Sequence, residues 1–260
     1  MGFVLKLNRV FLKIFGLIVL SGMVGQAVYG GRLHEAVKRG DIKQVQGLVD
    51  RGADISAIDE LGYLPLHLAV EKDFIKIASL LLKAGANVND PEFLFLRKPL
   101  HLAARSGRTE IAVLLLEWGA DVHVRDGMNY TPLHLAAGSG RTETAVLLLE
   151  WGAEVDALAE SNYSPFHSFA GSSRTELDSL KGGVSAVSDV IKSGYTPLHL
   201  AAWNGHIEMI LLLLEEGSKV NVMEDRRIKS FLSFAIGDDR MDLALYLKRL
   251  GCQKLFQKSQ

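Results

Sequence analysis

The sequence predicts an all-α solenoid of about seven helix-turn-helix units, called repeats below, with short β-hairpin fingers between them. The first observation is a histidine that recurs every 32 to 34 residues, with a serine in the seventh place: His34, His67, His101, His134, His167, His199 and Ser233. The second is a Pro-Leu-His-Leu-Ala motif around most of these histidines, and the third is a glycine that follows most of them by eighteen residues. A period in this range is typical of solenoids built from stacked supersecondary units.

The first helix of each repeat begins beside the histidine motif. Residues that cap helices well stand before the motif at Thr131, Ser164, Thr196 and Ser230. A proline follows them in most repeats, and at the first helical position its missing N–H costs nothing. Leu64 and Lys98 replace the capping residue in the second and third repeats, so we expect weaker caps there. The predicted repeats therefore start near residues 31, 64, 98, 131, 164, 196 and 230.

A turn, a second helix and a finger complete each repeat. Six places after the histidine stands a residue type that mostly tolerates left-handed backbone: Gly40, Asp73, Gly107, Gly140, Ser173, Gly205 and Asp239. Apolar runs such as 111–116 and 209–214 then predict the second helix, which ends at the glycine eighteen residues after the histidine. Segments such as GANVN and GADVH follow these glycines and predict the fingers.

The fifth repeat is degenerate. Asp178 and Lys181 replace apolar residues of the fourth repeat, and Gly182-Gly183 interrupts the second helix. Each glycine costs about 1 kcal/mol relative to alanine, so we expect a shortened or broken helix near 176–183. Two interpretations are open, a decayed copy and a functional hinge. Charged residues in the first and last repeats predict capped ends, hence a repeat domain over residues 28–253 and a C-terminal tail over residues 254–260.

The motif and its period resemble the ankyrin repeat. The stretches LPLHLAV, KPLHLAA, TPLHLAA and SPFHSFA carry the resemblance, which extends from residue 31 to about residue 251. It implies that fingertips and first helices form a concave face that binds other proteins. It also implies that the histidine bonds the capping threonine and neighbouring backbone. We therefore interpret the histidine as a hydrogen-bonded spacer between repeats and not as a metal ligand or a catalytic base.

The family's binding positions, carried over one at a time, give the candidate partner-binding residues. Those directly before the helix cap are Tyr63, Arg97, Tyr130, Tyr163 and Tyr195. The groove-facing positions of the first helices supply Arg105, Trp203 and Asn204, and the longer third finger supplies Phe93 and Phe95. Tyr, Trp and Arg suit interfaces because each combines apolar area with a polar tip. The tyrosines have a second interpretation, in which they pack finger against finger, and we interpret Trp118 and Trp151 as packing residues.

The remaining motifs give no sign of catalysis. The chain has no Walker sequence and no G-x-S-x-G elbow, and its single cysteine, Cys252, excludes an internal disulfide framework. The net charge of −1 gives no argument for a nucleic-acid partner. We expect a monomeric, non-catalytic scaffold with a protein partner, no catalytic residues, no cofactor and no metal. The alternative is an enzyme with an unrecognised site.

Residues 1–27 have the pattern of a secretory signal peptide. Their only charged residues are the basic Lys6, Arg9 and Lys13. An uncharged apolar stretch and the small-x-small sequence Gly25-Gln26-Ala27 follow, so we expect cleavage and export to the periplasm or the medium. Removal of residues 1–27 would change the net charge from −1 to −4. The alternative is an uncleaved membrane anchor over residues 10–28, which would make the protein a membrane-anchored adaptor or regulatory protein with a soluble repeat domain.

Overall fold

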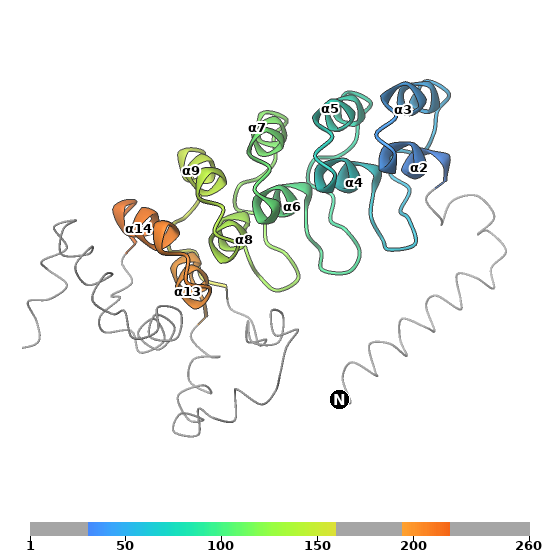
Figure 1. Cartoon of the computed structure of the whole chain (residues 1–260). Helices are drawn as coiled ribbons and strands as arrows, with labels where there is room; N and C mark the ends of the chain where they lie inside the picture. The colour runs from blue at the N-terminus through green and yellow to red at the C-terminus, as the bar shows by residue number, and fades with distance from the viewer. Residues whose placement is uncertain (1–30, 160–193, 219–260) are drawn as a thin grey trace, which may run out of the picture. The chain divides into compact units, whose positions relative to one another are not determined.

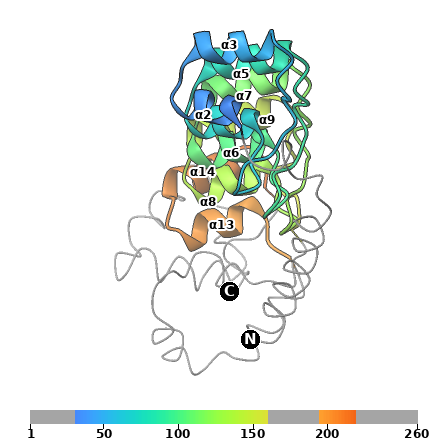
Figure 2. The same ribbon diagram turned by 90° about the vertical axis from the view of Figure 1, so that its right-hand side faces the viewer.

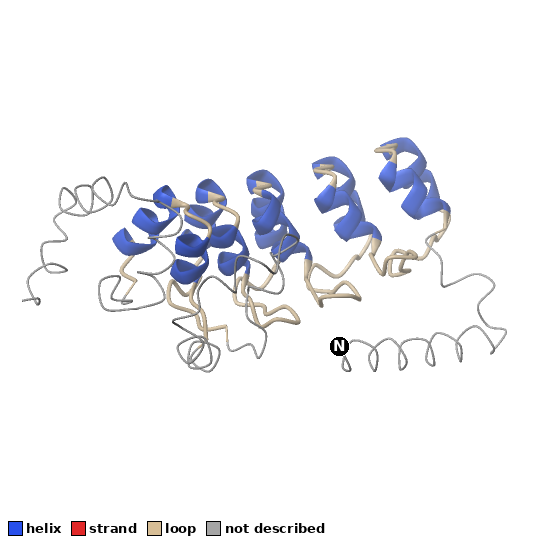
Figure 3. Ribbon diagram, turned by 60° about the horizontal axis from the view of Figure 1, so that its bottom comes forward, coloured by secondary structure: helices blue, strands red, loops and turns tan. Residues whose placement is uncertain are grey.

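The fold is that of a computed structural model, in which residues 31–159 and 194–218 are described (Figure 1). These residues form ten α-helices in five helix-turn-helix pairs, so the predicted all-α repeat class is confirmed. Within the described residues there is no β-strand (Figure 3). The chain divides into two compact units, of which the first contains the helices up to residue 83 and the second contains the helices from residue 99 onward.

The first compact unit consists of two stacked repeats. Its helices are α2 (Arg32–Lys38), α3 (Ile42–Val49), α4 (Pro65–Glu71) and α5 (Ile75–Lys83). Each pair packs internally, α2 contacts α4, and α3 contacts α5. Leu66 and Leu81 are buried between the helices, as are the small residues Ala36 and Ala69. Small side chains at these places allow neighbouring first helices to approach closely.

The second compact unit repeats this arrangement with three helix pairs. Its helices are α6 (Pro99–Ser106), α7 (Thr109–Glu117), α8 (Pro132–Gly138), α9 (Thr142–Glu150), α13 (Pro197–Trp203) and α14 (Ile207–Glu215). The first helices α6, α8 and α13 form one row, and the second helices α7, α9 and α14 form another (Figures 1 and 2). The largest fully buried aliphatic side chains of this unit are Leu100, Ile111, Leu115, Leu133, Leu148, Leu198, Leu200, Met209 and Ile210.

The backbone at the predicted turns has the conformation that the residue types indicate. All five described residues at the turn between paired helices have positive φ, and these include the non-glycine Asp73 at 63°. The glycine at the end of each described second helix also has positive φ. Thr131 caps α8, because its Oγ1 accepts the backbone N–H of His134 at 3.4 Å. Leu64 precedes α4 with no side-chain cap, as predicted.

The fingers are tight loops closed by single backbone bonds. The N–H of Asp59 donates to the carbonyl of Tyr63 at 2.9 Å, and the N–H of Asp126 donates to that of Tyr130 at 3.0 Å. The one isolated β-bridge recorded for the described residues joins Ala159 and Tyr195. The prediction of β-hairpin fingers is therefore not confirmed.

The sixth repeat packs directly against the fourth. Helix α13 contacts α8, and the ring Nε2 of His206 donates to the carbonyl of Gly138 at 3.3 Å. The finger that leaves α9 closes between Ala159 and Tyr195, whose backbone groups exchange bonds of 2.8 and 3.2 Å. The bond from the N–H of Ala159 to the carbonyl of Tyr195 corresponds to the bond from Asp126 to Tyr130 in the regular finger. Between Ala159 and Tyr195 there are 35 residues, whereas between Asp126 and Tyr130 there are three. Helices α8 and α13 are thus direct neighbours, and the residues of the predicted fifth repeat lie outside the described residues.

Several sequence predictions lie outside the described residues. They concern the signal peptide or anchor in residues 1–27, the broken helix near 176–183, Tyr163, and the seventh repeat from residue 230 with its tail. The count of seven repeats is accordingly not confirmed, and five helix pairs are described.

Candidate functional site

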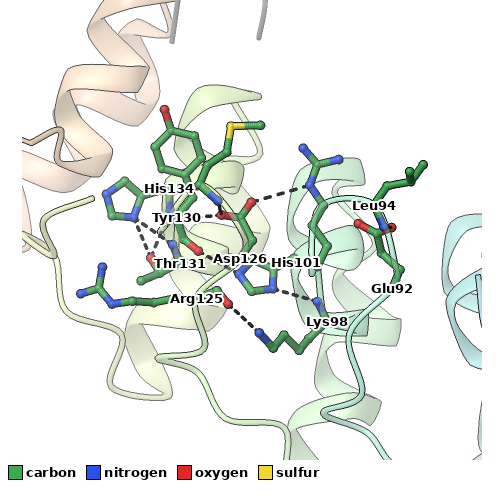
Figure 4. Close-up of polar contacts among 11 residues, drawn as sticks. Glu92, Leu94, Lys98, His101, Arg125, Asp126, Tyr130, Thr131 and His134 are labelled. Atoms are coloured by element: carbon green, nitrogen blue, oxygen red, sulfur yellow. Dashed lines mark hydrogen bonds and ion pairs between the residues drawn. The ribbon is translucent and has the colours of Figure 1, made fainter. Parts of the chain in front are cut away.

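The recurrent histidines are buried ties between neighbouring repeats. Nε2 of His101 donates to the carbonyl of Tyr130 at 2.9 Å (Figure 4). Nε2 of His134 donates to the carbonyl of Tyr195, also at 2.9 Å. Nδ1 of His134 accepts the backbone N–H of Thr131 at 3.2 Å and its hydroxyl at 2.8 Å. A carbonyl can only accept and an N–H can only donate, so these contacts fix the neutral tautomer protonated on Nε2. The predicted spacer role is confirmed for His34, His101 and His134.

These rings are unsuited to proton transfer at neutral pH. Burial lowers the pKa of His101 to about 3 and that of His134 to about 4, because the charged imidazolium loses its hydration. The bonds to carbonyls act in the opposite direction and do not offset the effect. A general base works best with a pKa near the operating pH and with access to its substrate. Both rings are fully buried and neutral, and their bonding groups are occupied by backbone.

An aspartate holds each regular finger turn. Oδ1 of Asp126 accepts the backbone N–H groups of Met128 and Tyr130, both at 2.9 Å (Figure 4). Its Oδ2 lies 3.7 Å from Nε of Arg97, a residue predicted to bind a partner. Arg97 also lies over the ring of Phe95, with 4.5 Å from its guanidinium carbon to the ring centroid. Arg97 is therefore partly buried and fixes its own finger to the next one.

Asp59 plays the same part in the first compact unit. Its Oδ1 accepts the N–H groups of Leu61 and Tyr63, both at 3.0 Å, and its Oδ2 lies 3.2 Å from Nζ of Lys38. Burial favours a raised pKa, but these backbone donors and the ammonium outweigh it, and the pKa of Asp59 is lowered. At Asp126 burial prevails and the pKa is raised. Sequence reasoning missed both aspartates, although each stands four places before a tyrosine that it had singled out.

The structure removes two of the four predicted tyrosines from the candidate binding surface. Tyr130 and Tyr195 are only 2% and 1% exposed. The ring of Tyr130 stacks on His134 at 5.5 Å, and that of Tyr195 meets His199 edge-on at 6.2 Å. Because both rings are buried, the packing interpretation holds for these two tyrosines. Tyr63 is partly buried.

Other predicted binding residues reach the surface. Arg105 at the end of α6 is exposed, and Trp203 and Asn204 at the end of α13 are partly exposed. The side-chain amide of Asn204 donates to the carbonyl of Leu200 at 3.0 Å, which fixes its orientation. In the third finger, Phe93 is 54% exposed and Phe95 is 43% exposed. Each of these predicted binding residues is therefore accessible within its own compact unit.

A hollow of about 470 Å³ lies in the second compact unit between a finger and the first helices. It is lined by Arg97, Arg105, Ser106, Arg108, Met128, Tyr130, Leu135, Ser139 and Arg141. Sequence reasoning singled out Arg97 and Arg105 but missed Arg108 and Arg141. The available signal was their position, because each stands seven residues after its repeat's histidine in a Ser-Gly-Arg-Thr-Glu segment.

The two tryptophans interpreted as packing residues are in fact exposed. Trp118 and Trp151 follow α7 and α9 and are 43% and 45% exposed. They form a second exposed aromatic position in two successive repeats.

The described residues offer no further chemical centre. Among them, no group of three or more His, Cys, Asp or Glu side chains is placed to hold a metal ion. None of the helices in residues 31–159 and 194–218 has the length and apolar character needed to cross a membrane.

The fold and these contacts define a repeat protein of stacked helical pairs. The family model of ankyrin repeats in three copies matches residues 33–126 and 97–159, and the single ankyrin repeat model matches residues 193–225. Together these matches cover more than half of the chain, which therefore belongs to the ankyrin repeat family.

Similar proteins share short stretches of this array. Human protein phosphatase 1 regulatory subunit 27 is 46% identical over 55 residues, which are 21% of this chain and 36% of that protein. Human ankyrin repeat domain-containing protein 40 is 36% identical over 69 residues, 26% of this chain and 19% of that protein. Mouse 2-5A-dependent ribonuclease is 43% identical over 56 residues, 21% of this chain and 8% of that protein. The chain thus spans about a third or less of each of these relatives.

Proposed function

We propose that the protein is a non-catalytic scaffold that binds a partner protein through the fingers and first helices of its second compact unit. One observation carries the proposal: Arg105, Trp203 and Asn204, at the ends of first helices, reach solvent, whereas the histidines of the motif are buried and neutral. Interfaces are enriched in Trp and Arg, which combine large contact area with polar tips. Membership of a repeat family and a relative named as a regulatory subunit support the same class of function.

Photo-cross-linking from defined positions tests which surface of the protein contacts the partner. A photo-cross-linking amino acid is introduced at position 204, beside α13, or at position 117, at the end of α7, in the full chain. After irradiation in extracts of the source cells, we expect adducts of one size from position 204 and none from position 117. Adducts from position 117 alone would move the interface to the second helices, beside the exposed Trp118 and Trp151.

A substitution pair gives an independent check. Trp203→Ala removes an aromatic side chain from the proposed face, and Trp151→Ala removes the same side chain from the end of α9. We expect the first change to weaken partner capture about tenfold or more, as loss of an interface anchor does. The second change is the matched control and leaves capture unchanged.

The N-terminal residues bear on the compartment in which the protein meets its partner. We propose that residues 1–27 direct export and are removed, with an uncleaved anchor over residues 10–28 as the rival. The three basic residues, the apolar stretch and the small-x-small sequence support export. N-terminal sequencing of the mature protein after cell fractionation is the test: a start near Val28 supports cleavage, and an intact Met1 in membranes contradicts it. We further propose that the scaffold acts as a monomer, without nucleic acid.

A further inference from the structure

The hollow of the second compact unit is rich in arginines and has a volume in the range of ligand sites. Its volume of about 470 Å³ lies within the range of about 300 to 1,000 Å³ that ligand sites occupy. Four of its nine lining residues are arginines, and no carboxylate lines it. The apolar part of the lining comes from Met128, Tyr130 and Leu135, of which Tyr130 and Leu135 are buried in the core.

Two of the four guanidinium groups form no ion pair with the residues that the structure describes. In the described part of the chain, no carboxylate oxygen lies within 4.0 Å of a side-chain nitrogen of Arg105 or Arg141. Nε of Arg141 donates to the backbone carbonyl of Arg105 at 3.4 Å, a bond that does not use the terminal nitrogens of Arg141. A Cβ atom on Gly107 would lie only 2.8 Å from Cδ of Arg141, so this glycine makes room for the arginine.

We propose that this hollow binds an acidic segment of the partner protein, with carboxylates on Arg105 and Arg141 and an apolar side chain against Met128, which is only partly buried. The proposal rests on the scaffold function above and names the chemistry of the partner. The planar guanidinium presents paired N–H donors that match the two oxygens of a carboxylate. Ser106 and Ser139 add hydroxyl groups at the rim of the same hollow. A ligand with both charge and apolar surface uses all parts of this lining.

The arrangement favours a peptide over a nucleic acid. Binding to a nucleic-acid backbone needs positive charge spread along a strand, with aromatic rings exposed for stacking. Here the arginines converge on one hollow, and its tyrosine is 2% exposed, with no free face for a base. The net charge of the whole chain is −1, which adds no general attraction for polyanions.

The experiment measures binding of defined peptides to the full chain by fluorescence anisotropy. The probe is a labelled twelve-residue peptide in which Glu and Leu alternate, and the comparison peptide has Gln in place of every Glu. We expect saturable binding of the Glu peptide that weakens as NaCl rises, and at least about tenfold weaker binding of the Gln peptide. The double variant Arg105→Gln plus Arg141→Gln should lose about tenfold in affinity. The matched control, Arg39→Gln plus Arg51→Gln, changes two exposed arginines of the first compact unit and should change affinity less than about twofold.

Each contrary outcome has a definite meaning. Equal affinity of the double variant and the wild type overturns the proposal, as does equal binding of the Gln and Glu peptides or no binding of the Glu peptide at 50 mM NaCl. Tighter binding of a phosphoserine peptide alone, or of a single-stranded oligonucleotide, would replace the carboxylate class. Ser139→Glu, which adds a negative charge at the rim, gives a second variant that should also weaken binding. Circular dichroism melting confirms that each variant is folded.

Failure of this proposal is separable from failure of the scaffold function. If the double variant still cross-links its partner from position 204 while no acidic peptide binds, the scaffold stands and the acidic ligand is wrong. If the wild-type chain cross-links no partner, the scaffold function itself is wrong.

Discussion

Residues 160–194 should be removable without loss of the stack formed by the fourth and sixth repeats. The variant replaces them with Gly-Met-Asn, the three residues that follow Asp126 in the regular finger, and adds Ala159→Asp to supply the turn carboxylate. The reason is that α8 already contacts α13, and Nε2 of His134 already donates to the carbonyl of Tyr195 at 2.9 Å. The finger also already closes between Ala159 and Tyr195.

The expected magnitude follows from loop closure. The entropic cost of closing a loop grows as (3/2)RT times the logarithm of its length. Shortening the connection from 35 residues to three therefore lowers the cost of folding by about 2 kcal/mol, if the excised residues add no contacts to the stack. For a domain of this size, that gain raises Tm by about 4 to 8 °C.

The assay is urea and thermal unfolding followed by circular dichroism, for the full chain and the excision variant. The control is an excision of similar length, residues 98–130, which removes α6 and α7 with the buried Leu100, Ile111 and Leu115. We expect the control to lower the free energy of unfolding, because α8 and α9 lose the buried helices that they pack against. A broad transition for the first variant, or a loss of more than about 2 kcal/mol, would refute the reasoning and assign residues 160–194 a packing role.

Three further predictions concern stability. Leu148→Ala should lower the free energy of unfolding by about 2 to 5 kcal/mol, because Leu148 is fully buried in α9. Val146 is 36% exposed on the same helix, so the control Val146→Ala should cost less than about 1 kcal/mol. Equal costs in urea titrations would contradict this difference in burial. His101 and His134 have folded-state pKa values of about 3 and about 4 against an ordinary 6.5, so between pH 6.5 and 4 the unfolded chain binds protons that the folded chain does not. The free energy of unfolding should then fall by about 1.4 kcal/mol per pH unit for each histidine as the pH drops, and titrations at pH 7 and 5 that agree would disprove it. Asp126→Ala leaves two finger N–H groups without their acceptor and should cost about 1 to 3 kcal/mol in the same assay, and a cost near zero would mean that water replaces the carboxylate.

The local structure of each repeat could be predicted from the sequence because it depends on local chemistry. Residue types that tolerate left-handed backbone predicted turns such as Asp73, whose φ is 63°, and the Thr-Pro pair predicted the start of α8. The resemblance to the ankyrin repeat predicted the bonds of the histidine, and the spacing of one full repeat between copies argued against a metal site. These features involve residues close together in sequence or related by a fixed period.

The order of stacking could not be predicted in the same way. The regular spacing of the motif predicts where each repeat begins in the sequence, but it does not predict which repeats contact each other. The contact between α8 and α13 depends on which surfaces fit together, and the degenerate residues near 178–183 were the only sign of a change. Burial of Tyr130 and Tyr195 was hidden for a related reason, since an aromatic finger residue suits an interface within the chain as well as one with a partner.

The ties between repeats reach carbonyl oxygens and not side chains. Nε2 of His34, His101 and His134 donates to the backbone oxygen of a finger residue, at 3.1, 2.9 and 2.9 Å. Every amino acid has a backbone carbonyl oxygen, so the hydrogen bond between neighbouring repeats does not depend on which residue supplies the acceptor. Exposed finger positions such as Phe95 can therefore change by mutation while the joints keep their geometry, and new binding preferences can evolve on this protein without a new architecture.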